Sequence, residues 1–433
     1  MKRLIIILLL VLAWPFQAQG QDNTKGYYKD VFMDSGIMLN SRTDLPVTEM
    51  LGLSMEAFVS TPHSSTAKYK FTRTDTLRQR ELIAGSPMDE NGILLYPDGQ
   101  PRFRMVYMNG GKAVNHGRSL EEAGRQAIRN FVKAGGSYLG SCAGAYIASI
   151  GSVQPGDNAD AKHVGIYMGL WPGYAVATRL NKSYTAVDIV ADGPLAEYFD
   201  FDGRMHIDSV RHNGGCYPNL ETAPKGTEIL ATYSTKGRQL ERDIDGLPVV
   251  WAHKESAETG RVVLCGSHPE GARIEADNLG LMAAMVRYAL AGNGTPRLKA
   301  VLSPGQPRVM ADRHDPAFAP VGDRQYHHFC IDVPKGLGRM VIELEGFLDA
   351  DDFDLHLYAS RKGFAYAGDA TWCNVGQKVS KTLEILRPKP GKYYISVFCA
   401  TTVTATTGKF GVEYSGRTDV LNGVPYTIRV DFD

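Results

Sequence analysis

The chain has 433 residues, which at about 150 residues per domain predicts two or three domains, each with a core of its own. Hydrophobic residues make up 43% and charged residues 22% of the chain, as in globular proteins, so neither a disordered nor a collagen-like chain is expected. Lys plus Arg and Asp plus Glu both number 47, and this balance excludes the strongly basic surface of a nucleic-acid-binding protein.

The first twenty residues have the pattern of a secretory signal peptide. Lys2 and Arg3 precede an apolar run over residues 4–13, and the small residues Ala18 and Gly20 provide a cleavage site. This run is shorter than the roughly 20 residues of a membrane-spanning helix, and no other stretch approaches that length. We therefore expect no transmembrane segment and export to the periplasm or the extracellular space.

The next region, residues 21–294, alternates strand-like and helical patterns, which is typical of a parallel sheet covered by helices. Its clearest unit is a strand at 103–108, a helix whose start is predicted by a capping box of Ser119 and Glu122, and a second strand at 137–140. This order predicts a right-handed β-α-β crossover.

The second strand leads into the segment Gly140-Ser-Cys142-Ala-Gly144, followed by a helical run. A strand, a sharp glycine-flanked turn and a helix form a nucleophile elbow, in which the central side chain stands above the sheet. Cys142 is therefore the candidate nucleophile, since exposed amides at the start of a helix favour a thiolate. The amide of Ala143 is expected to bind an oxyanion, with Gly111 as second donor, and Gly110 is a candidate substrate-binding residue.

A later strand, residues 261–265, is expected to pair with another at 247–253 and to deliver His268 to the same edge of the sheet. His268 is the candidate base, and Glu270, two residues on, is expected to orient it. A lone cysteine or histidine is more often structural, but the elbow, the Gly-Gly loop and the His-Pro-Glu segment together favour an active site.

Two further polar positions follow His212, which is either a pocket residue or a turn residue satisfied by backbone. Asn213 is the better candidate for substrate contact because its amide both donates and accepts, and Gly214 is expected to bind substrate with it. A helix is expected at 278–290.

Prolines make residues 295–319 a predicted linker. From 320 to 433 the helical period disappears, and short alternating runs with turn residues between them predict a small antiparallel β-sandwich. Those runs lie at 326–333, 339–344, 353–358, 381–385, 392–398, 409–414 and 426–432.

Six cysteines in an exported protein could pair in 15 ways, and the sequence does not choose among them. Cys216 and Cys265 are either core residues or a disulfide pair, and Cys373 could bridge to Cys399. Cys142 must stay unpaired if it is a nucleophile.

Two groups of residues resemble metal ligands but are better explained otherwise. The acidic run from Asp349 to Asp354 could bind Ca²⁺, although a polar turn is the more frequent explanation. His327 and His328 are adjacent on a strand and point to opposite faces, so they do not share one metal easily. We expect no bound metal and no cofactor.

The segments around Cys142 and Gly266-Ser-His-Pro-Glu270 resemble the class I glutamine amidotransferase-like superfamily, and more closely its group named after the N-terminal domain of biotin-protein ligase. The resemblance implies a flavodoxin-like doubly wound parallel sheet, with Cys142 as nucleophile, His268 as base and Glu270 as its orienter. His212-Asn-Gly-Gly215 is similar to that group's Asn-Gly-Gly stretch beside the pocket.

The C-terminal region is similar to the bacterial pre-peptidase C-terminal domain, a small β-sandwich appended to secreted hydrolases. The similarity lies in residues 326–334, 352–358 and 390–397. It implies attachment to an envelope component or glycan as the role of this domain.

Taken together, the sequence predicts an exported cysteine hydrolase that acts on an amide or peptide C–N bond of a small molecule or peptide. A non-catalytic envelope protein that binds a ligand on the same fold is the alternative. A biosynthetic amidotransferase subunit is a third possibility and requires a partner synthase.

Overall fold

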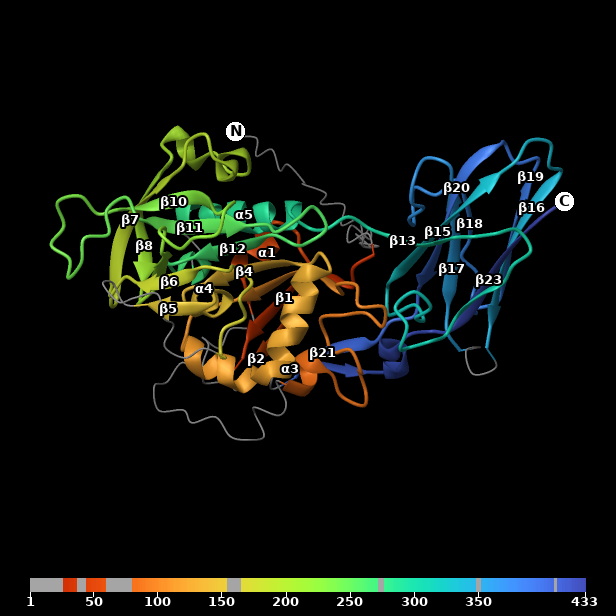
Figure 1. Ribbon diagram of the computed structural model, residues 1–433, viewed down its shortest axis with the longest axis horizontal. Coiled ribbons are helices and arrows are strands. Elements are labelled where there is room, and N and C mark those ends of the chain that lie inside the picture. The colour runs from red at the N-terminus through yellow and green to blue at the C-terminus, as the bar shows by residue number, and fades with distance from the viewer. Residues whose placement is uncertain are drawn as a thin grey trace, which may run out of the picture.

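The computed structural model describes residues 26–36, 44–59, 80–153, 165–271, 276–347, 352–408 and 411–433. A larger α/β unit and a smaller all-β unit follow one another along the long axis of the molecule (Figure 1). The signal peptide expected at residues 1–20 lies outside the described residues. No helix among the described residues has the length and apolar character needed to cross a bilayer.

A mixed sheet forms the centre of the α/β unit. Its parallel strands are, in spatial order, β2 (Met55–Val59), β1 (Lys29–Ser35), β3 (Phe103–Met108), β4 (Ser137–Ser141) and β12 (Val262–Cys265). Antiparallel strands extend it in the order β11 (Pro248–His253), β10 (Glu228–Ser234), β7 (Ser183–Ile189) and β8 (His206–His212). A separate small sheet contains β5 (Gly151–Val153), β6 (Tyr174–Ala177) and β9 (Cys216–Pro218). The expected pairing of the strands that become β11 and β12 is confirmed.

Helices cover both faces of this sheet because its strands are apolar on both sides. The helices are α1 (Pro46–Met50), α3 (Ala113–Lys133), α4 (Ala143–Ala148) and α5 (Ala276–Ala291), and short 3₁₀ turns lie at Pro194–Glu197, Phe201–Gly203, Pro269–Gly271 and Thr418–Asn422. Phe32 and Val106 belong to the cluster that includes the apolar face of α3, whereas their neighbours Val31 and Met105 belong to the cluster of α5. The expected doubly wound architecture is confirmed.

The start of the long helix differs from the prediction. Helix α3 begins at Ala113 and is interrupted at Glu121, whose φ is +53°. Ser119 does not cap the helix with its side chain; its hydroxyl donates to the carbonyl oxygen of His116 at 2.7 Å. The predicted start therefore coincides with a break inside a longer helix, because the preceding turns are helical without an apolar period that would reveal them.

The all-β unit is the predicted sandwich of two sheets. One sheet has the order β13 (Leu298–Val301), β15 (Tyr326–Val333), β20 (Gly391–Cys399), β17 (Leu355–Ser360) and β18 (Trp372–Asn374). The other has the order β14 (Arg308–Met310), β23 (Tyr426–Phe432), β16 (Arg339–Gly346) and β19 (Lys381–Leu386). All paired strands of the two sheets are antiparallel except β13 with β15 in the first sheet.

The expected linker at 295–319 contains regular structure, contrary to the prediction. Strand β13 lies between Pro296 and Pro304, and β14 lies between Pro307 and Pro316, so the prolines flank the strands without interrupting them. The linker therefore contributes an edge strand to each sheet of the sandwich.

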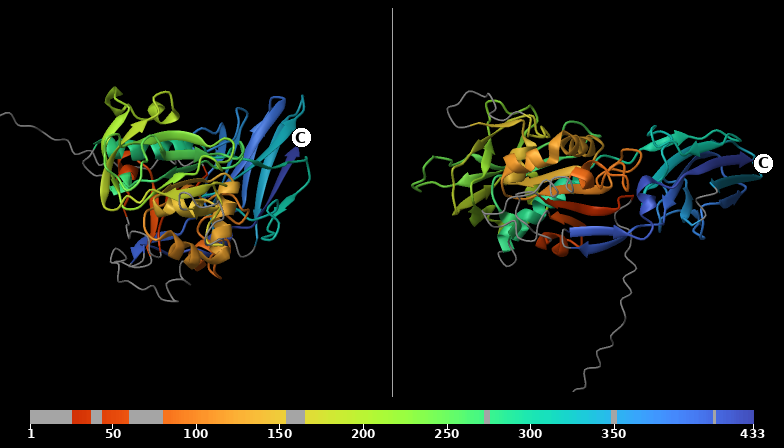
Figure 2. Two further views of the ribbon diagram at one scale, coloured as in Figure 1. Left: turned by 60° about the vertical axis from the view of Figure 1, so that its left-hand side comes forward. Right: turned by 90° about the horizontal axis from the view of Figure 1, so that it is seen from below.

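One hairpin of the C-terminal region belongs to the α/β unit. The run expected at 409–414 as a sandwich strand is part of the hairpin β21 (Thr404–Gly408) and β22 (Gly411–Ser415), and β22 pairs with β2 through Phe58 and Gly411. The Tyr414 hydroxyl also donates to the Glu56 carboxylate. The sheet consequently has 11 strands among the described residues, beginning with β21-β22-β2-β1, and β21 lies on the α/β side of the junction in all views (Figures 1 and 2).

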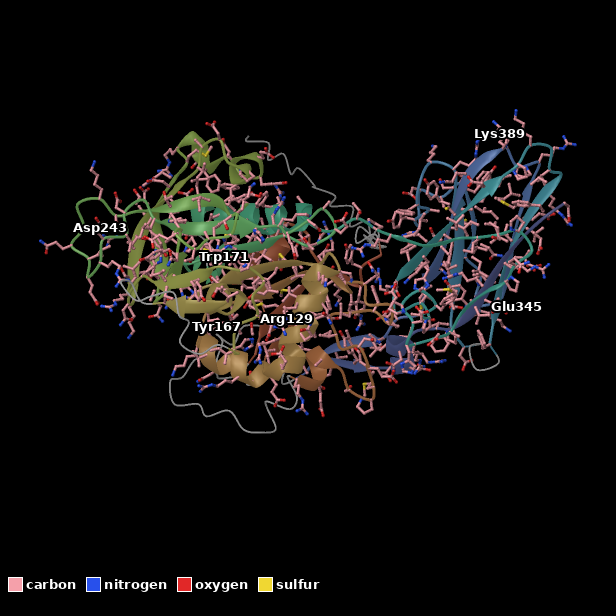
Figure 3. The ribbon with its side chains drawn as sticks, in the orientation of Figure 1. Arg129, Tyr167, Trp171, Asp243, Glu345 and Lys389 are labelled. Carbon is pink, nitrogen blue, oxygen red and sulfur yellow. The ribbon has the colours of Figure 1, made fainter. Side chains whose placement is uncertain are left out.

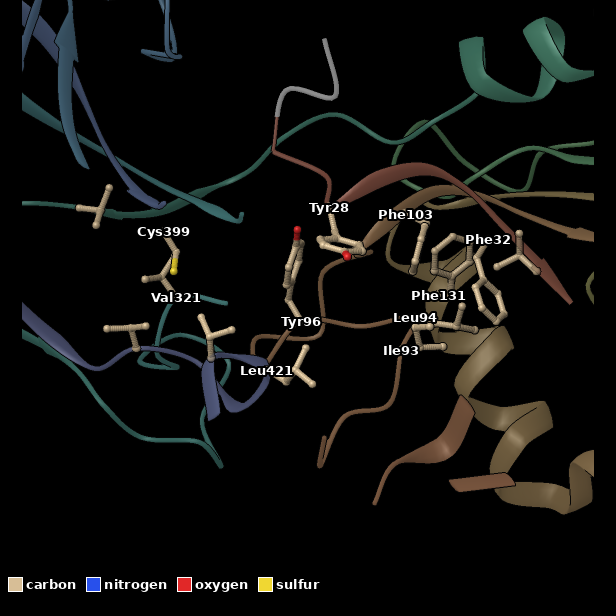
Figure 4. Packing of buried hydrophobic residues seen from close by; sticks show 14 of the residues in the cluster. Tyr28, Phe32, Ile93, Leu94, Tyr96, Phe103, Phe131, Val321, Cys399 and Leu421 are labelled. Carbon is tan, nitrogen blue, oxygen red and sulfur yellow. The ribbon is translucent and has the colours of Figure 1, made fainter. Parts of the chain in front are cut away.

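A continuous hydrophobic core connects the two units. Tyr96 lies between Tyr28 of the α/β unit and Leu421 near the sandwich (Figure 4). At the same junction, the Arg102 guanidinium forms a buried ion pair of 2.7 Å with Asp323 and lies 4.3 Å from the centroid of the Tyr28 ring. Charged side chains such as Asp243 and Lys389 project from opposite ends of the molecule (Figure 3).

Candidate functional site

Cys142 occupies the sharp turn between β4 and α4. Its φ of +48° and ψ of −102° are unfavourable for a residue with a side chain. A Cβ atom at Gly144 would lie 2.2 Å from the carbonyl oxygen of Met108, and one at Gly140 would lie 2.5 Å from the carbonyl carbon of Gly144. Both glycines are therefore needed for the close approach of the backbone, as in a nucleophile elbow.

His268 and Glu270 follow β12 and form a buried pair. Nδ1 of His268 lies 2.9 Å from Oε1 of Glu270, and the two side chains are 10% and 3% exposed. A carboxylate at Nδ1 favours the proton on that nitrogen and leaves Nε2 for exchange with a substrate or nucleophile. Nε2 is buried and makes no hydrogen bond of standard geometry within the described residues.

The elbow and the His268 turn meet at the carboxyl edge of the sheet. The Cys142 amide donates to the carbonyl oxygen of Cys265 at 2.8 Å, three residues before His268. Burial opposes a charge on His268, but the Glu270 carboxylate, its hydrogen bond to Nδ1 and the nearby Cys142 outweigh it, so the pKa of His268 lies well above its ordinary value. The structure thus brings Cys142, His268 and Glu270 together.

The two expected oxyanion donors lie on adjoining segments. Ala143 is the first residue of α4, and Gly111 is an exposed residue with φ of +156° just before α3. The segments are joined through Asn109, whose carbonyl oxygen accepts the Gly144 amide at 3.3 Å. Gly110 is buried between Asn109 and Gly111.

The loop of Asn213 and Gly214 covers the sulfur of Cys142. The thiol points to the backbone carbonyl oxygen of Asn213 at 4.0 Å, while the Asn213 residue itself is exposed. Gly215 follows with φ of +100°, and a Cβ there would lie 2.0 Å from the carbonyl oxygen of Gly266. The backbone of this loop contacts the Cys142 sulfur, and substrate contact by the Asn213 side-chain amide stays a prediction.

Hydrogen bonds hold that loop and the preceding residue, His212, in place. The Tyr146 hydroxyl donates to the Gly215 carbonyl oxygen at 2.7 Å, and His212 Nε2 lies 2.6 Å from the Thr185 hydroxyl. Burial, together with the nearby charge of His268, lowers the pKa of His212 to about 3, so its ring is neutral. His212 is therefore a fully buried residue at the end of β8, and a role for it in a substrate pocket stays a prediction.

A buried pair behind the Gly-Gly loop was not found from the sequence. Asp34 lies at the end of β1 and contacts His116 of α3 at 3.0 Å, and the next residue, Ser35, accepts the Asn109 side-chain amide at 3.1 Å. The only sequence signal was the position of Asp34 and Ser35 after an apolar strand. Their contacts anchor the segment that carries Gly110 and Gly111.

All six cysteines are free thiols. The disulfides considered for Cys216 with Cys265 and for Cys373 with Cys399 are therefore absent. Cys216 and Cys265 are fully buried, and burial raises the pKa of the Cys265 thiol to about 12. Cys373 is the exposed thiol, which matters for any labelling experiment.

The histidines and aspartates considered as metal ligands have other contacts. His327 Nδ1 lies 2.9 Å from the Tyr426 hydroxyl, and His328 Nδ1 lies 2.8 Å from the Ser396 hydroxyl, on opposite sides of β15. Asp349 and Asp351 lie outside the described residues, whereas Asp352 is an exposed partner of Arg417. In the parts of the chain that the structure describes, no group of three or more His, Cys, Asp or Glu side chains could hold a metal ion.

The fold is that of an α/β protein with a doubly wound mixed sheet, followed by a β-sandwich. Residues 87–288 match the family model described as biotin-protein ligase, N terminal, which confirms the resemblance seen in the motifs. The matched segment contains Cys142, His268 and Glu270.

An uncharacterized protein of Chlamydia muridarum (strain MoPn / Nigg) is 30% identical over 186 residues, which cover 41% of this chain and 65% of that protein. The chain therefore spans less than two thirds of that relative's length. A solved glutamine amidotransferase is 17% identical and superimposes with a TM-score of 0.29 over 43% of this chain and 80% of its own.

The pre-peptidase C-terminal domain of a collagenase from Bacillus anthracis is 12% identical, with a TM-score of 0.17 over 32% of this chain and all of that domain. The expected relation of residues 320–433 to this domain type stays a prediction.

Proposed function

We propose that this protein is an exported cysteine hydrolase that cleaves an amide or peptide C–N bond. The observation that carries the proposal is the placement of Cys142 in a strained turn beside the buried pair of His268 and Glu270. A nucleophile, a base and a group that orients the base are the three parts that covalent hydrolysis requires.

In the proposed reaction the Cys142 sulfur attacks the carbonyl carbon, and the thiol proton passes to Nε2 of His268. The amides of Ala143 and Gly111 stabilise the oxyanion. The C–N bond then breaks as His268 gives its proton to the leaving nitrogen, which leaves a thioester on Cys142. Water attacks the thioester, His268 takes a proton from it, and a carboxylic acid and the free thiol result.

The raised pKa of His268 supports this sequence of steps. A raised pKa favours the protonated ring, so His268 holds the proton that it takes from the thiol until it donates that proton to the leaving nitrogen. The Glu270 carboxylate provides this effect and also fixes the ring through Nδ1.

Hydrolysis is preferred to biosynthetic ammonia transfer because of the proposed export. An amidotransferase subunit needs an ATP-dependent synthase, and the compartments outside the cytoplasm hold little ATP. The proposed location is the periplasm or the extracellular space.

The test is acylation of the mature chain by p-nitrophenyl acetate, read by mass spectrometry. The exposed Cys373 is first replaced by serine, so that the remaining cysteines apart from Cys142 are buried. We expect one acetyl group at Cys142 in Cys373→Ser and none in the matched variant that also carries Cys142→Ala. Equal labelling of both variants would contradict the proposal.

Cleavage of a C–N bond is tested separately with a library of short peptides and peptide amides, with release of a new amine as the readout. Turnover that disappears in Cys142→Ala supports a hydrolase. Acylation of Cys142 without any amide turnover would contradict the assignment of the bond.

A non-catalytic ligand-binding protein is the second candidate, and the observation in its favour is the burial of Cys142. The residue is only 4% exposed, with the Asn213 carbonyl group over its sulfur. Saturable binding of an amide ligand that Cys142→Ser leaves unchanged, with no product, would favour this candidate.

A further inference from the structure

A groove crosses the junction of the two units on the side of the sheet away from Cys142. Its inner part is a cavity of about 290 Å³ and its outer part an open cleft of about 740 Å³. The two parts share their lining at Asp98, Gln100, Ala134, Arg297 and Pro316, so they form one continuous space.

The groove and the proposed catalytic site lie at opposite edges of the sheet. Tyr27, Pro101 and Ala134 line the groove and precede the parallel strands β1, β3 and β4. Cys142 follows β4, whose five residues span about 16 Å at 3.3 Å per residue. A ligand in the groove therefore does not reach the sulfur.

The inner wall of the groove is aromatic. Tyr326 and His328 line it from the sandwich, with ring planes 13° apart and ring centroids 5.9 Å apart, and the half-buried Tyr27 lines it from the α/β unit. Burial lowers the pKa of His328 to about 3, so this ring carries no charge. The exposed aromatic surface of the wall is mainly the half-buried Tyr27 ring, because Tyr326 and His328 are only 7% and 4% exposed. A neutral aromatic lining suits a ligand that has both apolar faces and polar groups.

The outer cleft is lined by uncharged hydrogen-bonding side chains together with charged side chains of both signs. Its polar side chains include Gln100, Asn130, Ser256 and Thr259. Amides and hydroxyls both donate and accept, so they match hydroxyl groups of a ligand in either direction.

The charges of the groove compensate one another. The positive side chains of the lining are Lys133, Arg297 and Lys299, and the negative ones are Asp98, Glu255 and Glu258. Asp98 is fully buried and forms an ion pair with Lys299. The lining therefore has as many positive as negative side chains, which argues against a polyanion or a polycation as ligand.

From the aromatic wall, the hydrogen-bonding cleft and the balanced charges together, we propose that the interdomain groove binds a neutral oligosaccharide chain. One sugar ring occupies the inner cavity, whose volume lies near the lower limit of about 300 Å³ for ligand pockets. The following sugars lie along the outer cleft past Gln100 and Asn130. Since the groove contains residues of both units, the site is incomplete in either unit alone.

The test is isothermal titration of the mature full chain with three neutral hexasaccharides: maltohexaose, cellohexaose and chitohexaose. An acidic peptide and a proline-rich peptide of similar length are titrated separately, because binding of either would identify the groove as a peptide site. We expect saturable binding of at least one hexasaccharide and no binding of either peptide.

Matched variants locate the binding. Gln100→Ala and Asn130→Ala each remove one surface amide, and each should weaken hexasaccharide binding about threefold to tenfold, the effect of one lost hydrogen bond. Gln377→Ala removes an exposed amide of the sandwich that does not line the groove and should bind as the parent does. Cys142→Ala should also bind as the parent does, which separates this inference from the proposed hydrolase.

The proposal is overturned if none of the hexasaccharides binds at millimolar concentration, if a peptide binds in their place, or if Gln100→Ala and Asn130→Ala both retain the parent affinity.

Discussion

At the scale of single residues, the site depends on a carboxylate that acts through its neighbour. Glu270 is 3% exposed and contacts Nδ1 of His268, and its charge is the main factor that offsets burial and raises the pKa of that ring. Glu270 is therefore a positioning residue, and its effect should be visible in the pH dependence of the reaction more than in binding.

The first prediction concerns this pair. His268→Ala should reduce the rate of Cys142 acylation by about 10²- to 10⁴-fold, the usual contribution of an acid-base group. Glu270→Gln keeps the shape but removes the charge, so the pKa of His268 should fall and the corresponding limb of the pH-rate profile should move to lower pH. Stopped-flow acylation across the pH range measures both effects. An unmoved limb in Glu270→Gln would show that another group titrates.

The same pair affects stability with a defined sign. A histidine whose pKa is raised by folding stabilises the native state fully below its unfolded value, near pH 6.5, and this contribution is lost as pH rises through the folded pKa. In Glu270→Gln this loss should be smaller, which urea denaturation at several pH values detects.

At the scale of elements, the loop of His212 to Gly215 controls access to the sulfur. Tyr146 on α4 donates to the Gly215 carbonyl oxygen, and Thr178, just after β6, donates to the Gly214 carbonyl oxygen at 3.1 Å. Both contacts hold the loop next to Cys142. We therefore expect the exposure of the Cys142 sulfur to depend on how firmly this loop is held.

The second prediction tests that arrangement. In a Cys373→Ser background, Tyr146→Phe removes one hydrogen bond worth about 0.5–1.5 kcal/mol, so alkylation of Cys142 by iodoacetamide should become about twofold to tenfold faster. Tyr426→Phe removes a buried hydroxyl of the sandwich and is the matched control. Equal acceleration in both variants would indicate general loosening of the protein.

Some of these elements could be predicted and others could not. Strands at 103–108, 326–333 and 426–432 have the predicted bounds, because short apolar or alternating runs between turn residues identify them locally. The placement of Cys142 and His268 at the same edge of the sheet could likewise be predicted, because each follows a recognisable parallel strand. By contrast, the contacts of Tyr146 and of Asp34 with His116 join segments far apart in the chain, and no local pattern encodes them.

At the scale of the whole molecule, the two units share one core and a buried charge pair. Arg102 and Asp323 are 2% and 1% exposed and come from different units, with Asp89 as a second carboxylate 3.7 Å from Arg102. Burial, against the opposing charge of Arg102, raises the pKa of Asp89 to about 6. The sequence suggested separate domains because such a pair is apparent only after folding.

The third prediction follows from this pair. Arg102→Met leaves Asp323 buried without its countercharge and should destabilise the protein by about 3–5 kcal/mol. Because the core is continuous, both units should unfold in one transition, monitored by calorimetry. The double variant Arg102→Met with Asp323→Leu should recover much of the loss. A lower-temperature transition confined to one unit would contradict the shared core.

The hairpin β21–β22 of the C-terminal region covers the edge strand β2 of the α/β unit. An unpaired edge strand exposes backbone amides and carbonyl groups that can pair with another chain, which promotes self-association. In this protein β22 pairs with β2 at that edge. A chain truncated after the α/β segment would therefore expose the edge of β2 and aggregate. Replacing the C-terminal region by an unrelated domain would leave the same edge unpaired.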